Sequence, residues 1–268
     1  MEKWQAEIDY RRPTGLENKK QYHIECSPGE IAPIVLVPGD QGRLSKIIKK
    51  LNNVTKIANN RGLITYTGNF QGIPISVTST GMGGPSSAIV YEELINIGAI
   101  WLIRIGSVAG LQPELNPGDI VLPFACVRDD GASIYYVPNQ YPAVADPFLY
   151  NYLNEKANQK KTKLWNGINW THSTFYSRSS EYFQQWARKR VISMDMEAAT
   201  LFIISQLRGV HAAFIGVVYE NRGRQSAKGN IDLSVGSPKR KKIQRGVEDA
   251  IDITLEGVVE LFNLKKKK

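Results

Sequence analysis

Arg104 points most directly to chemistry, because it interrupts the apolar run AIWLIRIG at positions 99–106. A guanidinium buried without a partner is strongly penalised in a protein interior. Two explanations stay open from the sequence: a buried carboxylate pairs with Arg104, or an anionic ligand does. The planar fork of arginine matches phosphate oxygens in a bidentate manner. The second explanation therefore predicts a phosphate-like ligand.

A group of glycines supports an anion site of this kind. They stand at positions 39, 81, 83, 84 and 106, and glycine lets backbone N–H groups approach an anion closely. Their spacing matches neither the G-x-x-x-x-G-K-[ST] pattern of a P-loop nor the G-x-G-x-x-G pattern of a dinucleotide site. The sequence therefore favours a small free oxyanion over bound ATP or a dinucleotide.

Asp195, Met196 and Glu197 form a second group, within the segment SMDMEAAT at 193–200. Acidic residues in a first helical turn commonly only complement the helix dipole. Alternatively, the two carboxylates accept hydrogen bonds from sugar hydroxyls while the thioether packs on the sugar face. The three histidines and two cysteines have no metal-ligand spacing, and no local motif indicates a Ser–His–Asp or Cys–His system. We expect no metal.

These residues need strands and helices that bring them together. We predict strands at 34–37, 73–80, 100–106, 119–123 and 213–219, and helices from Gly84-Pro85 to Gly98, from about Asp195 to Leu207, and across 247–262. Strands that alternate with helices predict an α/β fold with a mainly parallel sheet. Such a sheet binds ligands beyond the carboxyl ends of its strands. Four predicted strands run into the polar segments PGDQGR, GMGGP, RIGS and ENR.

The composition excludes several protein classes. The 268 residues are 42% hydrophobic and 22% charged, ordinary values for globular domains. Two cysteines cannot form a disulfide framework, no apolar run reaches the roughly 18 residues of a membrane span, and the first residues lack the apolar core of a signal peptide. Nine of the 34 basic residues lie in two runs near the C-terminus, which leaves 25 against 25 acidic residues. That balance argues against a nucleic-acid-binding face.

Four longer segments form a series along the chain: PGDQGR, TSTGMGGPSSAIVYEEL, RIGSVAGLQPELNPGDIVLP and DMEAATLF. Together they resemble the nucleoside phosphorylase family that contains uridine phosphorylase and the hexameric purine nucleoside phosphorylases. The resemblance covers about residues 21–262. Within it, VRDDGASIYYVPNQYPAVAD at 127–146 looks most like uridine phosphorylase, whereas the short stretch 175–197 looks more like archaeal purine or methylthioadenosine phosphorylases.

The resemblance implies a three-layer α/β/α sandwich around a central mixed β-sheet, as a single domain at 21–268 after an N-terminal extension at 1–20. It implies a pentosyltransferase that cleaves a nucleoside, uridine first, with phosphate to free base and ribose 1-phosphate. The alternatives are a purine nucleoside or methylthioadenosine phosphorylase, a nucleosidase that uses water, and a non-catalytic nucleoside or anion binder. Inorganic phosphate is the co-substrate, and no cofactor is expected. We expect a cytoplasmic salvage enzyme in homo-oligomers with shared active sites, usually hexamers, with no specific nucleic-acid or membrane partner.

The resemblance also implies roles for individual residues. It gives phosphate binding to Gly39, Arg43, Arg104, Gly106 and Ser107, with Arg61 entering from a neighbouring subunit. It gives nucleoside binding to Thr80, Phe175, Met196 and Glu197, with the neighbour's His23 on the ribose 5′-hydroxyl. Glu197 would accept from the 2′- and 3′-hydroxyls, and Phe175 would pack on the base.

Three positions depart from the family pattern. The usual Glu-Met-Glu reads Asp195-Met196-Glu197, so the first acid is one methylene shorter. The Gln-x-Arg that reads uracil is absent after Phe175-Tyr176, where Arg178 is the candidate substitute. Asn221-Arg222 resembles uridine phosphorylases, whereas Glu220 stands where purine enzymes carry the acid that protonates the base. We therefore add Asp195, Arg178, Asn221 and Arg222 to the nucleoside site, and Glu220 to Arg104 and Glu197 as catalytic candidates.

Overall fold

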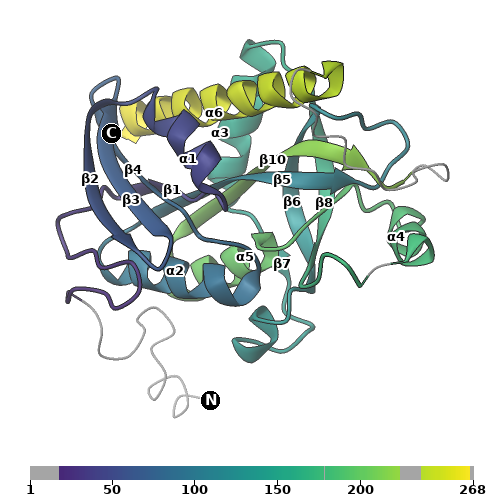
Figure 1. Cartoon of the computed structure of the whole chain (residues 1–268), viewed down its shortest axis with the longest axis horizontal. Coiled ribbons are helices and arrows are strands. Elements are labelled where there is room, and N and C mark those ends of the chain that lie inside the picture. The colour runs from purple at the N-terminus through teal and green to yellow at the C-terminus, as the bar shows by residue number, and fades with distance from the viewer. Residues whose placement is uncertain (1–17, 178, 224–236, 266–268) are drawn as a thin grey trace.

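A computed structural model describes residues 18–177, 179–223 and 237–265 (Figure 1). Its strands are β1 Ile34–Leu36, β2 Asn52–Asn60, β3 Leu63–Phe70, β4 Ile73–Thr78, β5 Trp101–Gly110, β6 Ile120–Asp129, β7 Ala143–Val144, β8 Leu164–His172, β9 Ser193–Asp195 and β10 His211–Asn221. Its helices are α1 Gln41–Ile48, α2 Gly84–Asn96, α3 Pro147–Gln159, α4 Ser180–Ala187, α5 Ala198–Arg208 and α6 Pro238–Lys265, with a short 3-10 turn η1 at Ser133–Tyr135. Most of the predicted N-terminal extension lies outside the described residues, so that boundary stays a prediction.

The helices cover the sheet from two sides, as Figure 1 shows. α1, α3 and α6 pack on one face around an apolar cluster that includes Leu44, Leu153 and Ile251. α2 and α5 pack on the other face around a cluster that includes Tyr91 and Phe202. Both clusters are closed to water, and their burial supplies the main stabilising free energy of the fold. The predicted three-layer α/β/α sandwich is confirmed.

The sheet is mixed, as the resemblance implied, and the expectation of a mainly parallel sheet is wrong. Among the described strands, five pairings are parallel and five are antiparallel. Much of the antiparallel part is the β2–β3–β4 meander, which turns at Arg61-Gly62 and Gln71-Gly72 with positive φ at all four residues. Such turns match the twist of antiparallel strands. β2 and β3 were not predicted, because their sequences lack the apolar pattern that marks a strand.

Five strands close on themselves beside the site. β5 pairs with β10 and β9, β10 also pairs with β6, and β8 joins β6 to β9. The closure brings the short strand β9 against β5, although some 90 residues separate them along the chain. The carboxyl end of β5 therefore faces both β9 and the end of β10.

Two element boundaries differ from prediction at functionally important places. The strand predicted at 100–106 continues to Gly110 as β5, so the segment RIGS lies inside the strand and does not follow it. α5 begins at Ala198, because Asp195 belongs to β9 and its carboxylate accepts the backbone N–H of Ala198 at 2.9 Å. That contact satisfies one of the free N–H groups at the start of the helix. Asp195 thus stabilises the start of α5 although it does not belong to the helix.

α6 carries the first of the two basic runs. Lys239, Arg240, Lys241, Lys242 and Arg245 lie in its first turns, and the second run begins at its last residue, Lys265. In the part of the chain that the structure describes, no helix combines the length and the apolarity that crossing a membrane requires.

Candidate functional site

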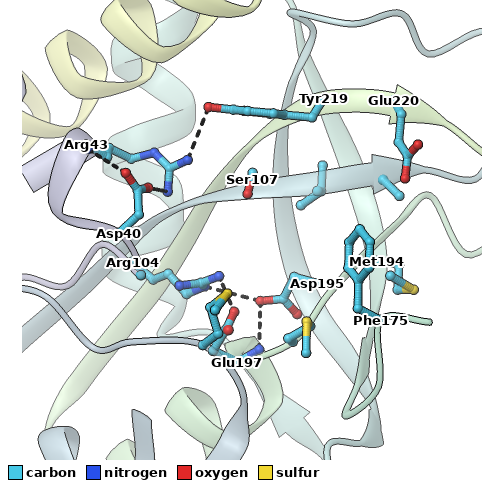
Figure 2. Close-up of a pocket in the computed structure, with 15 residues that line it drawn as sticks. Asp40, Arg43, Arg104, Ser107, Phe175, Met194, Asp195, Glu197, Tyr219 and Glu220 are labelled. Atoms are coloured by element: carbon cyan, nitrogen blue, oxygen red, sulfur yellow. Dashed lines mark hydrogen bonds and ion pairs between the residues drawn. The ribbon is translucent and has the colours of Figure 1, made fainter. Parts of the chain in front are cut away.

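A pocket of about 290 Å³ lies where the ends of β1, β5, β9 and β10 meet. All four polar segments PGDQGR, GMGGP, RIGS and ENR contribute residues to it. The lining residues are Gly39, Asp40, Arg43, Met82, Arg104, Ser107, Val108, Ala109, Phe175, Met194, Asp195, Met196, Glu197, Tyr219 and Glu220. Figure 2 shows two sides to this pocket. We call the side with Arg43 and Arg104 the cation end, and the side with Phe175, Met194 and Glu220 the aromatic end.

Arg104 is buried in β5 with two carboxylates beside it. Its Nε donates to Asp195 at 3.2 Å and its Nη2 to Glu197, and only 4% of the side chain is exposed. Burial alone would lower the pKa of Arg104, but the two carboxylates outweigh burial and raise it above its ordinary value. Nη1 has no hydrogen-bond partner among the described residues. Arg104 therefore has the carboxylate partners of the first explanation and keeps a donor for the ligand of the second.

Arg43 supplies a second buried guanidinium at the cation end. It lies in the first turn of α1, whose N-cap residue Asp40 accepts the Arg43 backbone N–H at 2.8 Å. The guanidinium contacts the Asp40 carboxylate at 3.1 Å, the Ile105 carbonyl at 3.1 Å and the Tyr219 hydroxyl at 3.4 Å. Its Nε has no partner within the described ranges. Asp40 and Tyr219 were missed as site residues, although both stand inside or next to motifs singled out from the sequence.

Asp195 is saturated by hydrogen bonds, in contrast to its predicted role in nucleoside binding. Its Oδ1 accepts from Asn169 Nδ2 and Thr171 Oγ1, both at 2.8 Å. Its Oδ2 accepts from Arg104 Nε and from the backbone N–H groups of Glu197 and Ala198. None of its side chain is exposed. A carboxylate so engaged fixes Arg104 and the chain ahead of α5, and has no lone pair directed at a sugar.

Glu197 keeps acceptor capacity toward the pocket. Its Oε1 accepts the Gly83 backbone N–H at 2.6 Å and its Oε2 pairs with Arg104. Burial raises the pKa of Glu197, and the nearby Asp195 adds to the rise, while Arg104 and the Gly83 N–H act in the opposite direction. The two carboxylate oxygens together offer about four acceptor sites, so the contacts from Gly83, Met196 and Arg104 leave acceptor capacity for a ligand. Met196 lines the same wall.

Gly106 makes room for the guanidinium. A Cβ at this position would lie 2.8 Å from the Phe214 ring and 3.0 Å from Arg104 Nη2. Gly39 lines the pocket on the other side of Arg104, where a Cβ would lie 3.6 Å from Nη1. Gly106 itself does not line the pocket and packs around Arg104, so its contact with phosphate stays a prediction.

The loop that carries Phe175 is anchored on Asp129. Asp129 Oδ2 accepts from Trp170 Nε1 at 3.1 Å and Tyr182 Oη at 3.0 Å, and lies 2.9 Å from His172 Nδ1. Burial raises the pKa of Tyr182, and the bond to Asp129 adds to the rise. These contacts join β8 to α4 on both sides of the loop. No role was predicted for Asp129 or His172, because neither belongs to a motif whose chemistry can be read locally.

Several predicted site residues are not among those that line the pocket. Thr80, Asn221 and Arg222 do not line it, and Arg178 lies outside the described residues. Asn221 Nδ2 instead donates to the carbonyls of Gln112 and Leu115.

His23 and Arg61 lie together at another part of the surface. His23 Nδ1 lies 2.6 Å from Glu93, and Arg61 donates to the Tyr22 hydroxyl at 3.2 Å. Asn60 Nδ2, next to Arg61 in the chain, donates to the carbonyl of His23 at 2.9 Å. Neither His23 nor Arg61 lines the pocket of its own chain.

Residues 33–256 match the sequence model of the phosphorylase superfamily. The chain belongs to that superfamily. It is 41% identical to a uridine phosphorylase of Thermococcus kodakarensis, over 77% of this chain and 79% of that one. It is 31% identical to a guanosine phosphorylase of Halorubrum lacusprofundi, over 90% and 99% of the two chains. The crystal structure of a uridine phosphorylase from Vibrio fischeri superposes with a TM-score of 0.83 at 29% identity, covering 90% of this chain and 98% of that one.

Proposed function

We propose that this protein is a nucleoside phosphorylase that cleaves uridine reversibly with inorganic phosphate. The observation that carries the proposal is the buried Arg104 guanidinium, held by two carboxylates and left with one unpaired donor in the pocket. The relatives named as uridine phosphorylases support uridine as the nucleoside. A pentosyltransferase of this kind belongs to nucleoside salvage, and we propose a cytoplasmic location for it.

Phosphate binds at the cation end. Arg43 and Arg104 each present a buried nitrogen with no partner among the described residues, and an unpaired buried donor costs about 1–3 kcal/mol. A phosphate oxygen satisfies both. Each charge pair at about 4 Å contributes roughly 4 kcal/mol at an effective dielectric constant near 20, before desolvation. Gly39 and Ser107 line the same side and supply an N–H and a hydroxyl.

The ribose lies between the two ends of the pocket. The remaining lone pairs of Glu197 accept from its 2′- and 3′-hydroxyls, and Met196 packs against its face. Because Glu197 is fixed by Arg104 and the Gly83 N–H, the sugar is oriented with C1′ toward the phosphate. Such positioning lowers the barrier by removing the entropy of orientation.

Reaction occurs at C1′. The C1′–N bond breaks with its electron pair leaving on the base, and a phosphate oxygen forms the new C1′–O bond on the opposite face. The products are free base, which takes a proton from solvent, and ribose 1-phosphate with inverted configuration. An oxocarbenium-like transition state is stabilised by the phosphate anion held beside it. Phe175 packs on the departing base.

A neighbouring subunit completes the site. His23 and Arg61 lie together at the surface but outside the pocket of their own chain, which supports a role in the pocket of a second copy. Arg61→Ala and Arg104→Ala would then both be inactive alone. Mixed oligomers of the two variants would regain activity, because one site in a hybrid dimer carries neither change. Hybrids as inactive as either parent would contradict the shared site.

The reaction is tested by chromatography of uridine, thymidine, inosine, guanosine, adenosine and methylthioadenosine incubated with the protein. Each is measured with and without phosphate. Uracil and ribose 1-phosphate formed only when phosphate is present is the expected result. Base release at the same rate in water would indicate a nucleosidase, and binding without turnover across the panel would indicate a binding protein.

A further inference from the structure

Glu220 is a carboxylate at the aromatic end of the pocket, where the proposed reaction needs a contact to the base. β10 pairs with β5 in parallel, and the register shifts between Val218 and Glu220. On a regular strand Tyr219 and Glu220 would point to opposite faces. Here both line the pocket, and a bulge re-aims side chains in this manner. Figure 2 shows the Glu220 side chain on the same side as Phe175.

The chain that follows Glu220 is fixed by hydrogen bonds and close packing. Asn221 Nδ2 donates to the carbonyls of Gln112 at 2.8 Å and Leu115 at 2.6 Å, and the Gly223 N–H returns to Asn221 Oδ1 at 2.8 Å. A Cβ on Gly223 would lie 1.9 Å from the Leu111 carbonyl oxygen, so the chain here tolerates only glycine. Glu220 therefore stands on a rigid support.

The carboxylate itself is held by Arg222. Arg222 Nη2 lies 2.9 Å from Glu220 Oε2, and the guanidinium packs over the ring of Phe183 at 5.6 Å. Only 15% of the Glu220 side chain is exposed. Arg222 does not line the pocket, so it supports Glu220 from behind and leaves the second carboxylate oxygen, Oε1, for a ligand.

We infer that Glu220 is a specificity residue that accepts a hydrogen bond from the ring N–H of a base carrying an adjacent carbonyl. An ion-paired carboxylate offers acceptors and no donor. A ring N–H beside a carbonyl is a stronger donor than an exocyclic amine, because the carbonyl withdraws electron density. Uracil, thymine, guanine and hypoxanthine present such an N–H, whereas cytosine and adenine present an unprotonated ring nitrogen. The pocket thus selects keto bases and disfavours amino bases.

This inference rests on the proposed function and gives Glu220 a role in binding the base, not in protonating it. A hydrogen bond made equally in the ground state and the transition state changes KM and leaves kcat unchanged. A role as general acid would instead change kcat. The split between the two constants therefore distinguishes the roles.

The test measures phosphorolysis of uridine, 3-methyluridine and cytidine by the wild type, Glu220→Gln, Glu220→Ala and the control Glu155→Gln. Glu155 is an exposed acid on α3. For Glu220→Ala we expect kcat/KM for uridine to fall about 10- to 100-fold through KM, and the preference for uridine over 3-methyluridine to shrink by a similar factor. Glu220→Gln, nearly isosteric, gains an N–H donor, so its preference for uridine over cytidine also falls.

Unchanged substrate ratios in both Glu220 variants, with uridine still cleaved by the wild type, would overturn this inference and leave the proposed function intact. A wild type that cleaves none of the nucleosides with phosphate would overturn the proposed function itself. If guanosine is the better substrate, 1-methylguanosine replaces 3-methyluridine in the same comparison.

Discussion

The buried ion pair at the cation end of the pocket lies inside the sheet, whereas the aromatic ring at the other end lies on a connecting segment. Arg104 lies within β5 and its partner Asp195 within β9, and 4% and 0% of their side chains are exposed. At the other end, 44% of Phe175 is exposed, on the connection between β8 and α4.

This difference in exposure matches two different functions, which are anion binding and base recognition. Holding an anion near a guanidinium needs a dry, fixed environment, because electrostatic interactions weaken steeply in water. Recognising a base needs a surface that can vary without disturbing that environment, and loops carry such variation. We expect changes at the cation end to abolish the reaction, and changes at the aromatic end to alter which base is accepted.

The largest effect is expected from Arg104→Ala. Removing the guanidinium takes away a preorganised donor for phosphate, a loss of about 100- to 1000-fold in kcat. It also leaves two carboxylates buried without their cation, which lowers the free energy of unfolding by about 3–5 kcal/mol. Steady-state kinetics and denaturant titration measure both.

Arg208→Ala is the matched control, because Arg208 pairs with Glu92 between α5 and α2, outside the pocket. We expect that variant to keep its kcat. A near-normal kcat in Arg104→Ala would contradict the expectation that the reaction depends on the cation end.

A smaller, pH-dependent effect is expected from Glu197. Its pKa is raised chiefly by burial, so the carboxylate that accepts from the sugar is protonated as pH falls through a value above the ordinary glutamate range. The acidic limb of kcat/KM should therefore lie above that range. Glu197→Gln should lower kcat/KM about 10- to 100-fold and lose this limb. An unchanged acidic limb in the variant would assign it to another group.

The raised pKa of Glu197 also affects how the free energy of unfolding depends on pH. A carboxyl whose pKa is higher in the folded chain than in the unfolded chain stabilises the fold at pH below its ordinary value. That contribution is lost as pH rises through the raised value. Glu197→Gln should therefore make the free energy of unfolding less dependent on pH across this window.

The smallest effect is expected from Asp129→Asn at the aromatic end. An uncharged amide oxygen is a weaker acceptor than a carboxylate oxygen, so the contacts to Trp170, His172 and Tyr182 weaken and the loop with Phe175 loosens. KM for the nucleoside should rise about 2- to 10-fold, while KM for phosphate stays unchanged. An equal rise in both Michaelis constants would indicate that the two ends are not independent.

The sequence predicted the cation end better than the aromatic end, for physical reasons. Arg104 in an apolar run, the glycines and the acids at 195 and 197 are unusual within their own segments, so each is visible locally. The role of Asp195 was not visible, because it depends on Asn169 and Thr171 of another strand.

The contacts at the aromatic end are set by tertiary structure. The Asp129 anchor joins β6, β8 and α4, and the bulge that directs Glu220 exists only in the pairing of β10 with β5. The β2–β3 hairpin was missed for a related reason. The residues of β2 are mostly exposed and lack the apolar pattern that marks a strand.

The ion pairs of Arg104 join residues 91 and 93 positions apart in the chain. During translation, β5 therefore leaves the ribosome with a cation in its apolar run long before Asp195 and Glu197 exist. Burying a strand that carries an unpaired cation in the protein interior is energetically unfavourable. The first half of the chain should thus remain incompletely packed until the second half is synthesised, and a nascent chain arrested near residue 180 should be readily cut by proteases.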